Sequence, residues 1–350
     1  MNSQQSLHLW YESNKRDLPW RKTHNPYLIW LSEIILQQTR VNQGLPYFLK
    51  FSQKYPQIEL LACAPEDEVL KLWQGLGYYS RGRNMLKSAQ DIVSNHAGKF
   101  PDNYSDLLKL KGIGPYTAAA IASFAFNEPI AVLDGNVFRV LSRFYLISEP
   151  INTGFAKKLF SELANEFLNK ENPATHNQAM MELGALICTP KKPACVDCPL
   201  QSNCLAFMQG TQVQYPVKLA KVKPKNRYIA YFHFQFNSQI AVFRRPKGGI
   251  WEGLYDLPYI ESEELMESSD RIKQAIDKKW ISSHEEIEMV FEKKHLLTHQ
   301  HIYAQFFLIH CKRKPFLQFD ETWIKKVNLP QLGVSRLLQI YLDIALAEPK

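Results

Sequence analysis

The chain lacks any apolar stretch long enough to cross a membrane, since its longest apolar run, Tyr116 to Phe126, falls short of the roughly 20 residues required. Its start also lacks a basic end followed by an apolar core, so we expect no secretory signal. Acidic residues are fewer than basic ones, 34 against 42, giving a net charge of +8. These features predict a cytoplasmic protein with no membrane partner, and the excess of basic residues favours a polyanionic partner.

Cysteine is scarce, and four of the six cysteines fall in one short stretch with the spacing C-x6-C-x2-C-x5-C. Four thiolates in a compact loop are soft ligands for zinc or an iron–sulfur cluster. A reducing compartment disfavours the alternative of two disulfides. Because zinc sites more often use paired CxxC units and only one occurs here, the spacing favours a cluster, for which a structural role is the simplest interpretation; the loop cysteines are Cys188, Cys195, Cys198 and Cys204.

The two cysteines outside this stretch, Cys63 and Cys311, are expected to be buried thiols. A chain of 350 residues with 45% hydrophobic residues predicts about two domains with sizeable cores. We expect a helical region over residues 1–209, a polar and proline-punctuated linker over 210–226, and a smaller domain over 227–350. The smaller domain begins with two alternating strands around Asn237-Ser238.

Within the helical region, apolar spacing predicts a helix from Leu7 to Lys15 and a second from Tyr27 to Gln43, opened by Asn25-Pro26. Glu33 lies inside the second helix. A carboxylate there either points to solvent, which is the commoner case, or is desolvated with a raised pKa. Polar residues follow one turn later and can hydrogen-bond to bases and phosphate; they are Gln37, Gln38 and Arg40.

Gly112 and Gly114 are followed by Pro115 and a helix-forming TAAAIA run, which predicts a glycine hairpin that leads into a helix. Backbone N–H groups at such a hairpin can bind a phosphate, although an ordinary connection between two helices is the commoner alternative. About twenty residues on, an apolar run stops at LDGN. Asp134 or Asn136 can cap the helix that follows, and Asp134 is expected at the mouth of the site beside the hairpin.

Residues 73–84 read WQGLGYYSRGRN, a predicted glycine-rich loop with paired tyrosines and two arginines. Interleaved aromatic and basic residues can stack on bases and contact phosphates. A core turn with buried tyrosines explains the same residues equally well.

Together the segments LPWR, SEIILQQTR, WQGLGYYSRGRN, LKGIGPYTA, AVLDGNV and the cysteine loop resemble the adenine DNA glycosylase family of the helix-hairpin-helix glycosylase superfamily. The resemblance covers most of residues 17–204. It implies a mainly α fold, in which a two-lobed helical region carries a [4Fe–4S] cluster on its cysteine loop. It also implies excision of adenine mispaired with 8-oxoguanine, and with guanine, from double-stranded DNA by a monomer associated with the nucleoid.

The resemblance also implies roles for individual residues. Excision requires that adenine leave the base stack, that a proton reach the leaving base, and that a negative charge lie near the sugar cation. Glu33 matches the family's acid and Asp134 its stabiliser of the cation, supported by Tyr116 and Asn136. Glu33 then needs a raised pKa, whereas Asp134 should stay ionised.

For DNA binding, the resemblance implies that Gln38 and Tyr78 enter the duplex and that Gly112 and Gly114 anchor phosphate beside the lesion, with Arg21 as a further DNA contact. Related endonuclease III enzymes carry a lysine two residues after the second glycine, which forms a Schiff base and cleaves the strand. Here that residue is Tyr116, so a monofunctional glycosylase is expected.

Three nearby residues are interpreted separately. Phe138 takes a position that some relatives fill with lysine, so any contact made by that lysine is absent. Arg139 and Arg143 are expected to contact either phosphate or the core.

The segment KGGIWEGLYDLP resembles the family's C-terminal domain, which is similar to the Nudix hydrolase MutT. Because the following segment lacks the REx2EE-type arrangement of a metal-binding helix, no hydrolase activity is expected. The family recognises 8-oxoguanine through a hairpin with an FSH-type triplet, here Leu297, Thr298 and His299, for which an ordinary strand is the alternative. Two other functions remain open: a glycosylase with lyase activity and a non-catalytic DNA-binding iron–sulfur protein.

Overall fold

A computed structural model describes residues 2–220, 223–282 and 285–346. Contacts divide the chain into two units, one made of Met1–Cys63 and Asn84–Ala220, the other of Ala64–Arg83 and Lys221–Lys350. Among the described helices, none combines the length and the apolar character that a membrane span requires.

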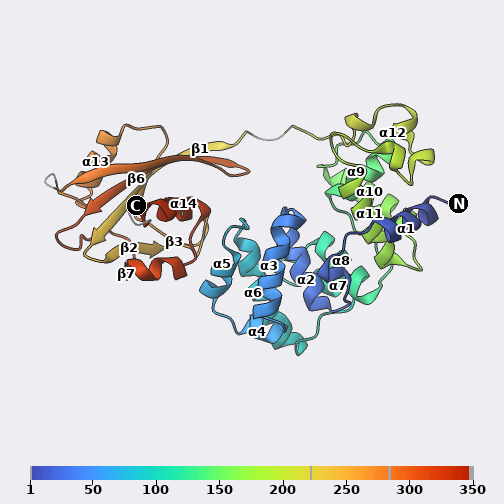
Figure 1. Ribbon diagram of the computed structural model, residues 1–350, viewed down its shortest axis with the longest axis horizontal. Coiled ribbons are helices and arrows are strands. Elements are labelled where there is room, and N and C mark those ends of the chain that lie inside the picture. The colour runs from blue at the N-terminus through green and yellow to red at the C-terminus, as the bar shows by residue number, and fades with distance from the viewer. Residues whose placement is uncertain (1, 221–222, 283–284, 347–350) are drawn as a thin grey trace. The chain divides into compact units, whose positions relative to one another are not determined.

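The first unit is helical (Figure 1). Its helices are α1 (Ser3–Asn14), α2 (Pro26–Leu36), α3 (Val41–Lys54), α4 (Ile58–Ala62), α7 (Tyr104–Leu107), α8 (Pro115–Phe126), α9 (Gly135–Phe144), α10 (Gly154–Phe167), α11 (Pro173–Leu186) and α12 (Leu205–Met208). Short 3-10 helices cover Pro19–Arg21, Cys195–Asp197, Gln201–Asn203 and Gln212–Gln214. Helix α6 (Ser80–His96) begins in the second unit and continues in the first.

Helices α2 and α8 pack against each other and form an apolar centre of the first unit. Every residue of α8 from Thr117 to Phe124 is buried, as expected for a helix that is apolar all round. In α2 the Asn25 side chain accepts hydrogen bonds from the backbone N–H groups of Tyr27 and Leu28, and Pro26 follows as the first helical residue. The predicted opening of this helix at Asn25-Pro26 is confirmed.

A second core lies between α1, α9, α10 and α11. Leu7 and Tyr11 of α1 pack there with Phe160 and Leu183. Three of the four loop cysteines also pack against this core, so the cysteine loop is fixed to α9 and α11.

The structure corrects the bounds of two predicted segments. The helix predicted from Tyr27 to Gln43 ends at Leu36, because Gln38 takes a left-handed backbone with φ of 56°, and α3 starts at Val41. The predicted loop 73–84 is helical from Ser80 onward. In α6, Gly82 lies close to the Trp73 ring. A Cβ atom at position 82 would lie 3.1 Å from that ring, so glycine allows the close approach.

The glycine hairpin is confirmed. Gly112 has φ of 80°, and a Cβ atom there would lie 2.8 Å from the Cβ of Asn84, so only glycine fits. Gly114 is the N-cap residue of α8. The hairpin therefore leads directly into the N-terminus of the buried helix.

The second unit is built on a seven-stranded mixed sheet in the order β3-β2-β1-β6-β5, with β4 beside β1 and β7 beside β2. Strands β1 and β6 are parallel, and the other pairs are antiparallel. The strands are β1 (Lys225–Phe236), β2 (Gln239–Arg244), β3 (Tyr255–Asp256), β4 (Tyr259–Ser262), β5 (Ile287–Leu296), β6 (Gln300–His310) and β7 (Glu321–Lys325). The predicted pair of strands around Asn237-Ser238 is confirmed.

Helices α13 (Ser268–Asp277) and α14 (Arg336–Ala345) cover opposite faces of this sheet (Figure 1). Alternation along β1 explains this, since Tyr231 packs with α14 whereas Phe232 packs on the face covered by α13. The unit also contains α5 (Glu66–Trp73) and a 3-10 helix at Lys326–Gln331.

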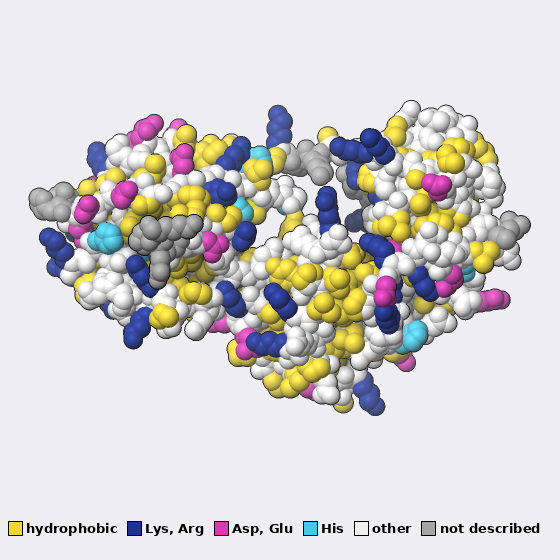
Figure 2. Space-filling model, in the orientation of Figure 1, with side chains coloured by type: hydrophobic (Ala, Val, Ile, Leu, Met, Phe, Trp, Pro, Cys, Tyr) yellow, Lys and Arg dark blue, Asp and Glu magenta, His cyan; other side chains and the backbone are white. Residues whose placement is uncertain are grey.

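Strand β1 starts at Lys225, inside the predicted linker 210–226, and residues 221–222 of that linker lie outside the described residues. Cys63 is exposed, so the prediction of a buried thiol was wrong for it, while Cys311 is partly buried. On the face seen in Figure 2, Lys and Arg side chains occur over both units and alternate with Asp and Glu. The net positive charge therefore does not form one continuous patch on that face.

We expect Gly184→Ala to destabilise the first unit. Gly184 of α11 approaches α9 so closely that a Cβ atom would lie 2.5 Å from the Cβ of Asn136 and 3.1 Å from its Cα. Forcing the helices apart should lower the free energy of unfolding by about 1–3 kcal/mol. Unfolding followed by far-UV circular dichroism measures this effect. Gly154→Ala is the matched control because open space surrounds Gly154, and equal stability of the two variants would contradict the packing argument.

Candidate functional site

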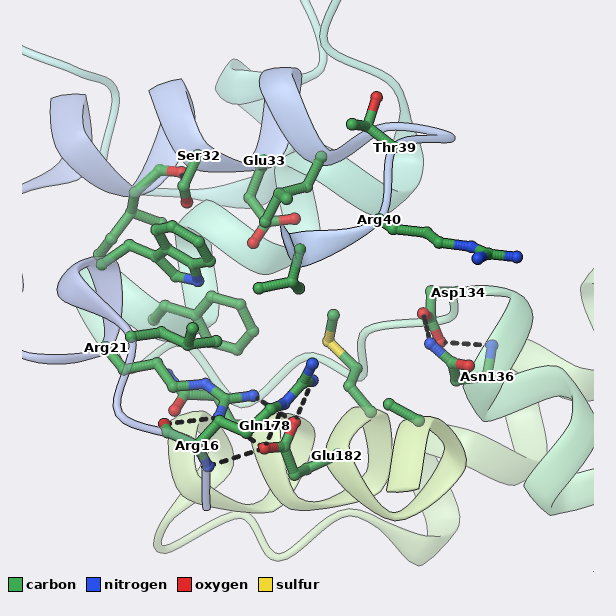
Figure 3. A pocket seen from close by; sticks show the side chains of 18 of the residues that line it. Arg16, Arg21, Ser32, Glu33, Thr39, Arg40, Asp134, Asn136, Gln178 and Glu182 are labelled. Carbon is green, nitrogen blue, oxygen red and sulfur yellow. Dashed lines mark hydrogen bonds and ion pairs between the residues drawn. The ribbon is translucent and has the colours of Figure 1, made fainter. Parts of the chain in front are cut away.

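One cavity of about 420 Å³ in the first unit contains the acidic residues singled out from the sequence. Its walls come from α2, α8, α9, α11 and the segment that precedes α2. Glu33 points into it from α2, and Asp134 lies across it at the start of α9 (Figure 3). Its volume is within the range of about 300–1,000 Å³ usual for small-molecule sites.

Glu33 is desolvated, which is the less common of the two alternatives considered for it. Its side chain is only 4% exposed, because α2 is buried over most of its length. Burial raises the pKa of Glu33 to about 7; the nearby Asp134 carboxylate adds to the rise, whereas the Tyr116 hydrogen bond and Arg21 oppose it. Near neutral pH, Glu33 is therefore present partly as a protonated acid.

Asp134 is held in a different environment. It is the N-cap residue of α9, and its Oδ1 accepts the backbone N–H of Asn136 at 2.9 Å and of Val137 at 2.7 Å. The Asn136 side-chain amide donates to Oδ2 at 2.7 Å. Burial raises the pKa of the Asp134 carboxyl, while these three hydrogen bonds and the helix N-terminus favour its ionised form.

Tyr116 lies in the first turn of α8, and its hydroxyl donates a hydrogen bond to Oε2 of Glu33. Burial, and then the carboxyls of Glu33 and Asp134, raise the pKa of Tyr116 well above its ordinary value. The hydroxyl therefore stays neutral and remains a hydrogen-bond donor to Glu33.

A buried ion-pair cluster forms the wall opposite α2. Glu182 of α11 is fully buried and accepts two hydrogen bonds from each of the guanidinium groups of Arg16 and Arg21. Burial alone would raise the pKa of Glu182, but hydrogen bonds from Arg16 and Arg21 outweigh it and bring the pKa to about 2. Arg21, predicted to contact DNA, thus lies in the cavity wall with its guanidinium already paired.

Several polar residues of the cavity escaped the sequence analysis. Gln178 and Glu182 are one turn apart on α11, and the Tyr11 hydroxyl donates to the Gln178 Oε1 at 2.6 Å. Their spacing of four residues within an apolar helix is the signal that could have identified them. Arg16 and Ser32 also line the cavity.

The predicted DNA contacts lie in both units. Gln38 is exposed, and Gly112 and Gly114 form the hairpin ahead of α8. In the second unit Tyr78 is 44% exposed, and its hydroxyl hydrogen-bonds to Oγ1 of Thr298. Thr298 lies between Leu297 and His299 in the turn that joins β5 to β6, so the alternative of an ordinary strand is excluded for the triplet.

The four loop cysteines surround one small cavity and form no disulfides. Arg143 of α9 borders this cavity and donates to the Cys188 Sγ at 3.2 Å. Its other hydrogen bonds go to carbonyl oxygens of Thr189, Pro190 and Tyr215, so Arg143 makes core contacts. Within the described residues, no three His, Cys, Asp or Glu side chains are placed to hold a single metal ion.

Arg139 and Phe138 also belong to the interior of the unit. Arg139 donates to the carbonyl oxygens of Cys188 at 2.6 Å and Gly184 at 2.6 Å, and to the Asn136 Oδ1 at 2.8 Å. Phe138 packs against Phe160, with ring centroids 5.1 Å apart. Of the two alternatives considered for Arg139 and Arg143, phosphate contacts or core contacts, the structure therefore favours core contacts for both.

Both parts of the chain match known protein families. Residues 31–166 match the family described as HhH-GPD superfamily base excision DNA repair protein, and residues 230–343 match the NUDIX domain. A solved structure of a thermostable thymine-DNA glycosylase is similar with a TM-score of 0.55 and 29% identity, covering 59% of this chain and 95% of that one.

Curated relatives span both parts. The adenine DNA glycosylase of Buchnera aphidicola subsp. Baizongia pistaciae is 38% identical over 266 residues, which is 75% of each protein. The adenine DNA glycosylase of Arabidopsis thaliana is 37% identical over 302 residues, covering 75% of this chain but 48% of that longer protein. Since the Buchnera protein is 38% identical and is matched over three quarters of its length, the chain belongs to the adenine DNA glycosylase family, with a helix-hairpin-helix region followed by a Nudix-like domain.

Proposed function

We propose that this protein is a monofunctional DNA glycosylase that hydrolyses the N-glycosidic bond of adenine paired with 8-oxoguanine or guanine. One observation carries the proposal: two buried carboxyls line the same cavity, Glu33 within α2 and Asp134 hydrogen-bonded at the N-terminus of α9. The names of the relatives supply the substrate class.

In this reaction protonated Glu33 gives its proton to the leaving adenine as the bond from C1′ to the base breaks. Ionised Asp134 stabilises the positive charge that develops on the sugar, as the second carboxylate does in glycosidases. A water molecule then adds to C1′ and releases a proton, which leaves an abasic site. Tyr116 and Asn136 keep the two acids in position through their hydrogen bonds.

Strand cleavage by a lyase step would need an amine that attacks C1′. Among the described residues that line the cavity, the nitrogen cations all belong to arginines, and Tyr116 stands where endonuclease III enzymes carry lysine. Guanidinium groups do not form Schiff bases at neutral pH because they remain protonated. The reaction is therefore expected to end at the abasic site.

The cysteine loop is proposed to hold a [4Fe–4S] cluster. Four thiols surround one cavity instead of converging on a point, which suits a polynuclear cluster whose irons each bind one thiolate. Arg143 at its edge supplies a positive charge and an N–H donor to sulfur. In this site the cluster would join Cys188 at the end of α11 to the loop that follows, a structural contribution.

Lesion recognition is proposed for the second unit, which supplies Tyr78, Leu297, Thr298 and His299 around a second cavity. Leucine and threonine replace the phenylalanine and serine of the commoner triplet, while a hydroxyl and an imidazole are retained. The Thr298 hydroxyl lies within hydrogen-bonding reach of Tyr78, so both groups can face one base.

Glu33→Gln should abolish excision. A glutamine keeps the size of the side chain but has no acidic proton, so the single-turnover rate on a labelled duplex with adenine opposite 8-oxoguanine should fall by at least about 100-fold. Duplex affinity should change little. With the unchanged protein, strand scission should require alkali, and borohydride should trap no protein–DNA adduct.

Glu162→Gln is the matched control, since Glu162 is exposed on α10. Its rate should equal that of the unchanged protein. Retained excision in Glu33→Gln would refute the acid assignment, a trapped adduct would favour the lyase alternative, and duplex binding without any excision would favour a non-catalytic DNA-binding protein.

The excision rate should fall as pH rises through about 7, because the pKa of Glu33 is about 7 and only its protonated form donates. Single-turnover rates at saturating protein across a pH series measure this. A rate that stays constant or rises with pH through this window would contradict the assignment.

Stability provides an independent check of the same carboxyl. The pKa of Glu33 is raised from 4.5 to about 7 on folding. The contribution of this carboxyl to the free energy of unfolding is therefore fully present below about pH 4.5 and is lost as pH rises through 7. Glu33→Gln should therefore gain stability relative to the unchanged protein above pH 7, by at most about 3 kcal/mol. Denaturant titrations at both ends of this pH range would detect the gain.

Cys198→Ser should lower the iron and sulfide content of the purified protein and remove its visible absorbance, because a cluster loses one of four thiolate ligands. The exposed Cys63 provides the matched control, and Cys63→Ser should keep its iron. Stoichiometric zinc without iron in the unchanged protein would refute the cluster.

A further inference from the structure

A second cavity of about 420 Å³ lies within the second unit, beside the turn that joins β5 to β6. The residues 76–80, the turn 249–251 and the turn 296–300 line it. Tyr78 and Thr298, already discussed as recognition residues, are among them. The turn 249–251 contributes a lining residue that the proposed function leaves unused, Trp251.

Trp251 has an unusual backbone. Its φ of 60° lies in the left-handed region, which bulky side chains rarely adopt. Hydrogen bonds of the turn hold this conformation: the Leu254 N–H donates to the Trp251 carbonyl at 3.0 Å, and the Gly253 N–H donates to the Arg245 carbonyl at 3.0 Å. Strained residues that their surroundings hold in place cluster at ligand-binding sites.

Glu252, the residue after Trp251, holds the turn in place through contacts with Gly248 and Arg83. The Gly248 N–H donates to the Glu252 carboxylate at 3.1 Å. Arg83, which lines the same cavity, forms an ion pair with that carboxylate at 3.5 Å and donates to the Glu252 carbonyl. These contacts hold the backbone at Trp251 in place, so the indole keeps its position in the lining of the cavity.

The indole also rests on a rigid support. The Arg245 guanidinium lies 5.5 Å from the centroid of the Trp251 ring and is only 5% exposed. Arg245 is itself fixed by an ion pair with Asp256 at 3.1 Å and by the Tyr259 ring at 4.5 Å. Cation–π contact with a buried arginine orients the indole before any ligand arrives.

We propose that Trp251 is a specificity-determining residue, whose indole stacks on the base opposite the excised adenine. The proposal rests on the function proposed above and extends it to this cavity. A half-buried indole supplies a stacking surface for a purine, while the hydroxyl of Thr298 and the imidazole of His299 supply polar partners for its edge. Trp251 also packs against the sheet core, so a test has to separate stacking from support of the fold.

Stacking and support of the fold can be separated by comparing the affinity for duplexes with and without a base opposite the adenine. In a Glu33→Gln background, which prevents excision, duplex affinity is compared for Trp251 and Trp251→Ala. One duplex carries adenine opposite 8-oxoguanine, and the other carries adenine opposite an abasic site. Loss of stacking should weaken binding to the first duplex about tenfold or more, and to the second by no more than about twofold. Trp251→Phe should retain most of the affinity.

Trp323→Ala is the control for removal of an indole elsewhere in the same unit, since Trp323 of β7 is not part of the cavity lining. It should weaken binding to the two duplexes equally. An equal loss on both duplexes for Trp251→Ala, or no loss on either, would overturn the proposal. If the unchanged protein excises adenine and this coupling is absent, only the role of Trp251 fails; if it excises no adenine, the proposed function fails.

Discussion

Desolvation of the Glu33 carboxyl is the constraint on which the site depends. An ionised carboxylate is disfavoured inside an apolar helix pair, so α2 and α8 together keep a proton on an acid at neutral pH. Arg21 could cancel this effect because a nearby cation favours the ionised form. It is instead held by Glu182, which it shares with Arg16. The Glu182 carboxylate therefore offsets part of the positive charge that Arg21 presents to Glu33.

Asp134 is buried as Glu33 is, but its carboxylate accepts several hydrogen bonds at a helix N-terminus. A helix cap is among the most rigid positions for a side chain, and here the cap residue is also the proposed charge stabiliser. Its partner Asn136 is fixed by Arg139, which also binds the carbonyl of Cys188. A continuous set of hydrogen bonds therefore connects the cysteine loop with Asp134. This connection couples the position of the cysteine loop to that of Asp134.

Local signals predicted much of this arrangement and missed what depends on distant contacts. The hairpin at Gly112 and Gly114 and a helix cap at Asp134 or Asn136 follow from residue types at fixed offsets; the hairpin is found, and the cap is Asp134. The end of α2 was missed, because nothing in the apolar spacing before Gln38 indicates its left-handed backbone. Glu182 was missed for a different reason, since its partners are more than 160 residues away in sequence.

Residues with a left-handed backbone occur both inside and outside the candidate sites. Asparagine adopts this conformation with little strain, so Asn127 at the end of α8 and Asn237 between two strands are ordinary turns. Gln38, Tyr78 and Trp251 do not share asparagine's tolerance of the left-handed conformation, yet all three take φ between 47° and 60°. Each strained residue of this kind costs of order 1–3 kcal/mol, which only a well-packed neighbourhood can offset. Ala97, Leu146, Lys279 and Gln318 take the same conformation outside the candidate sites, so a left-handed backbone alone does not identify a site in this chain. Tyr78 and Trp251 differ from them because both also line one cavity.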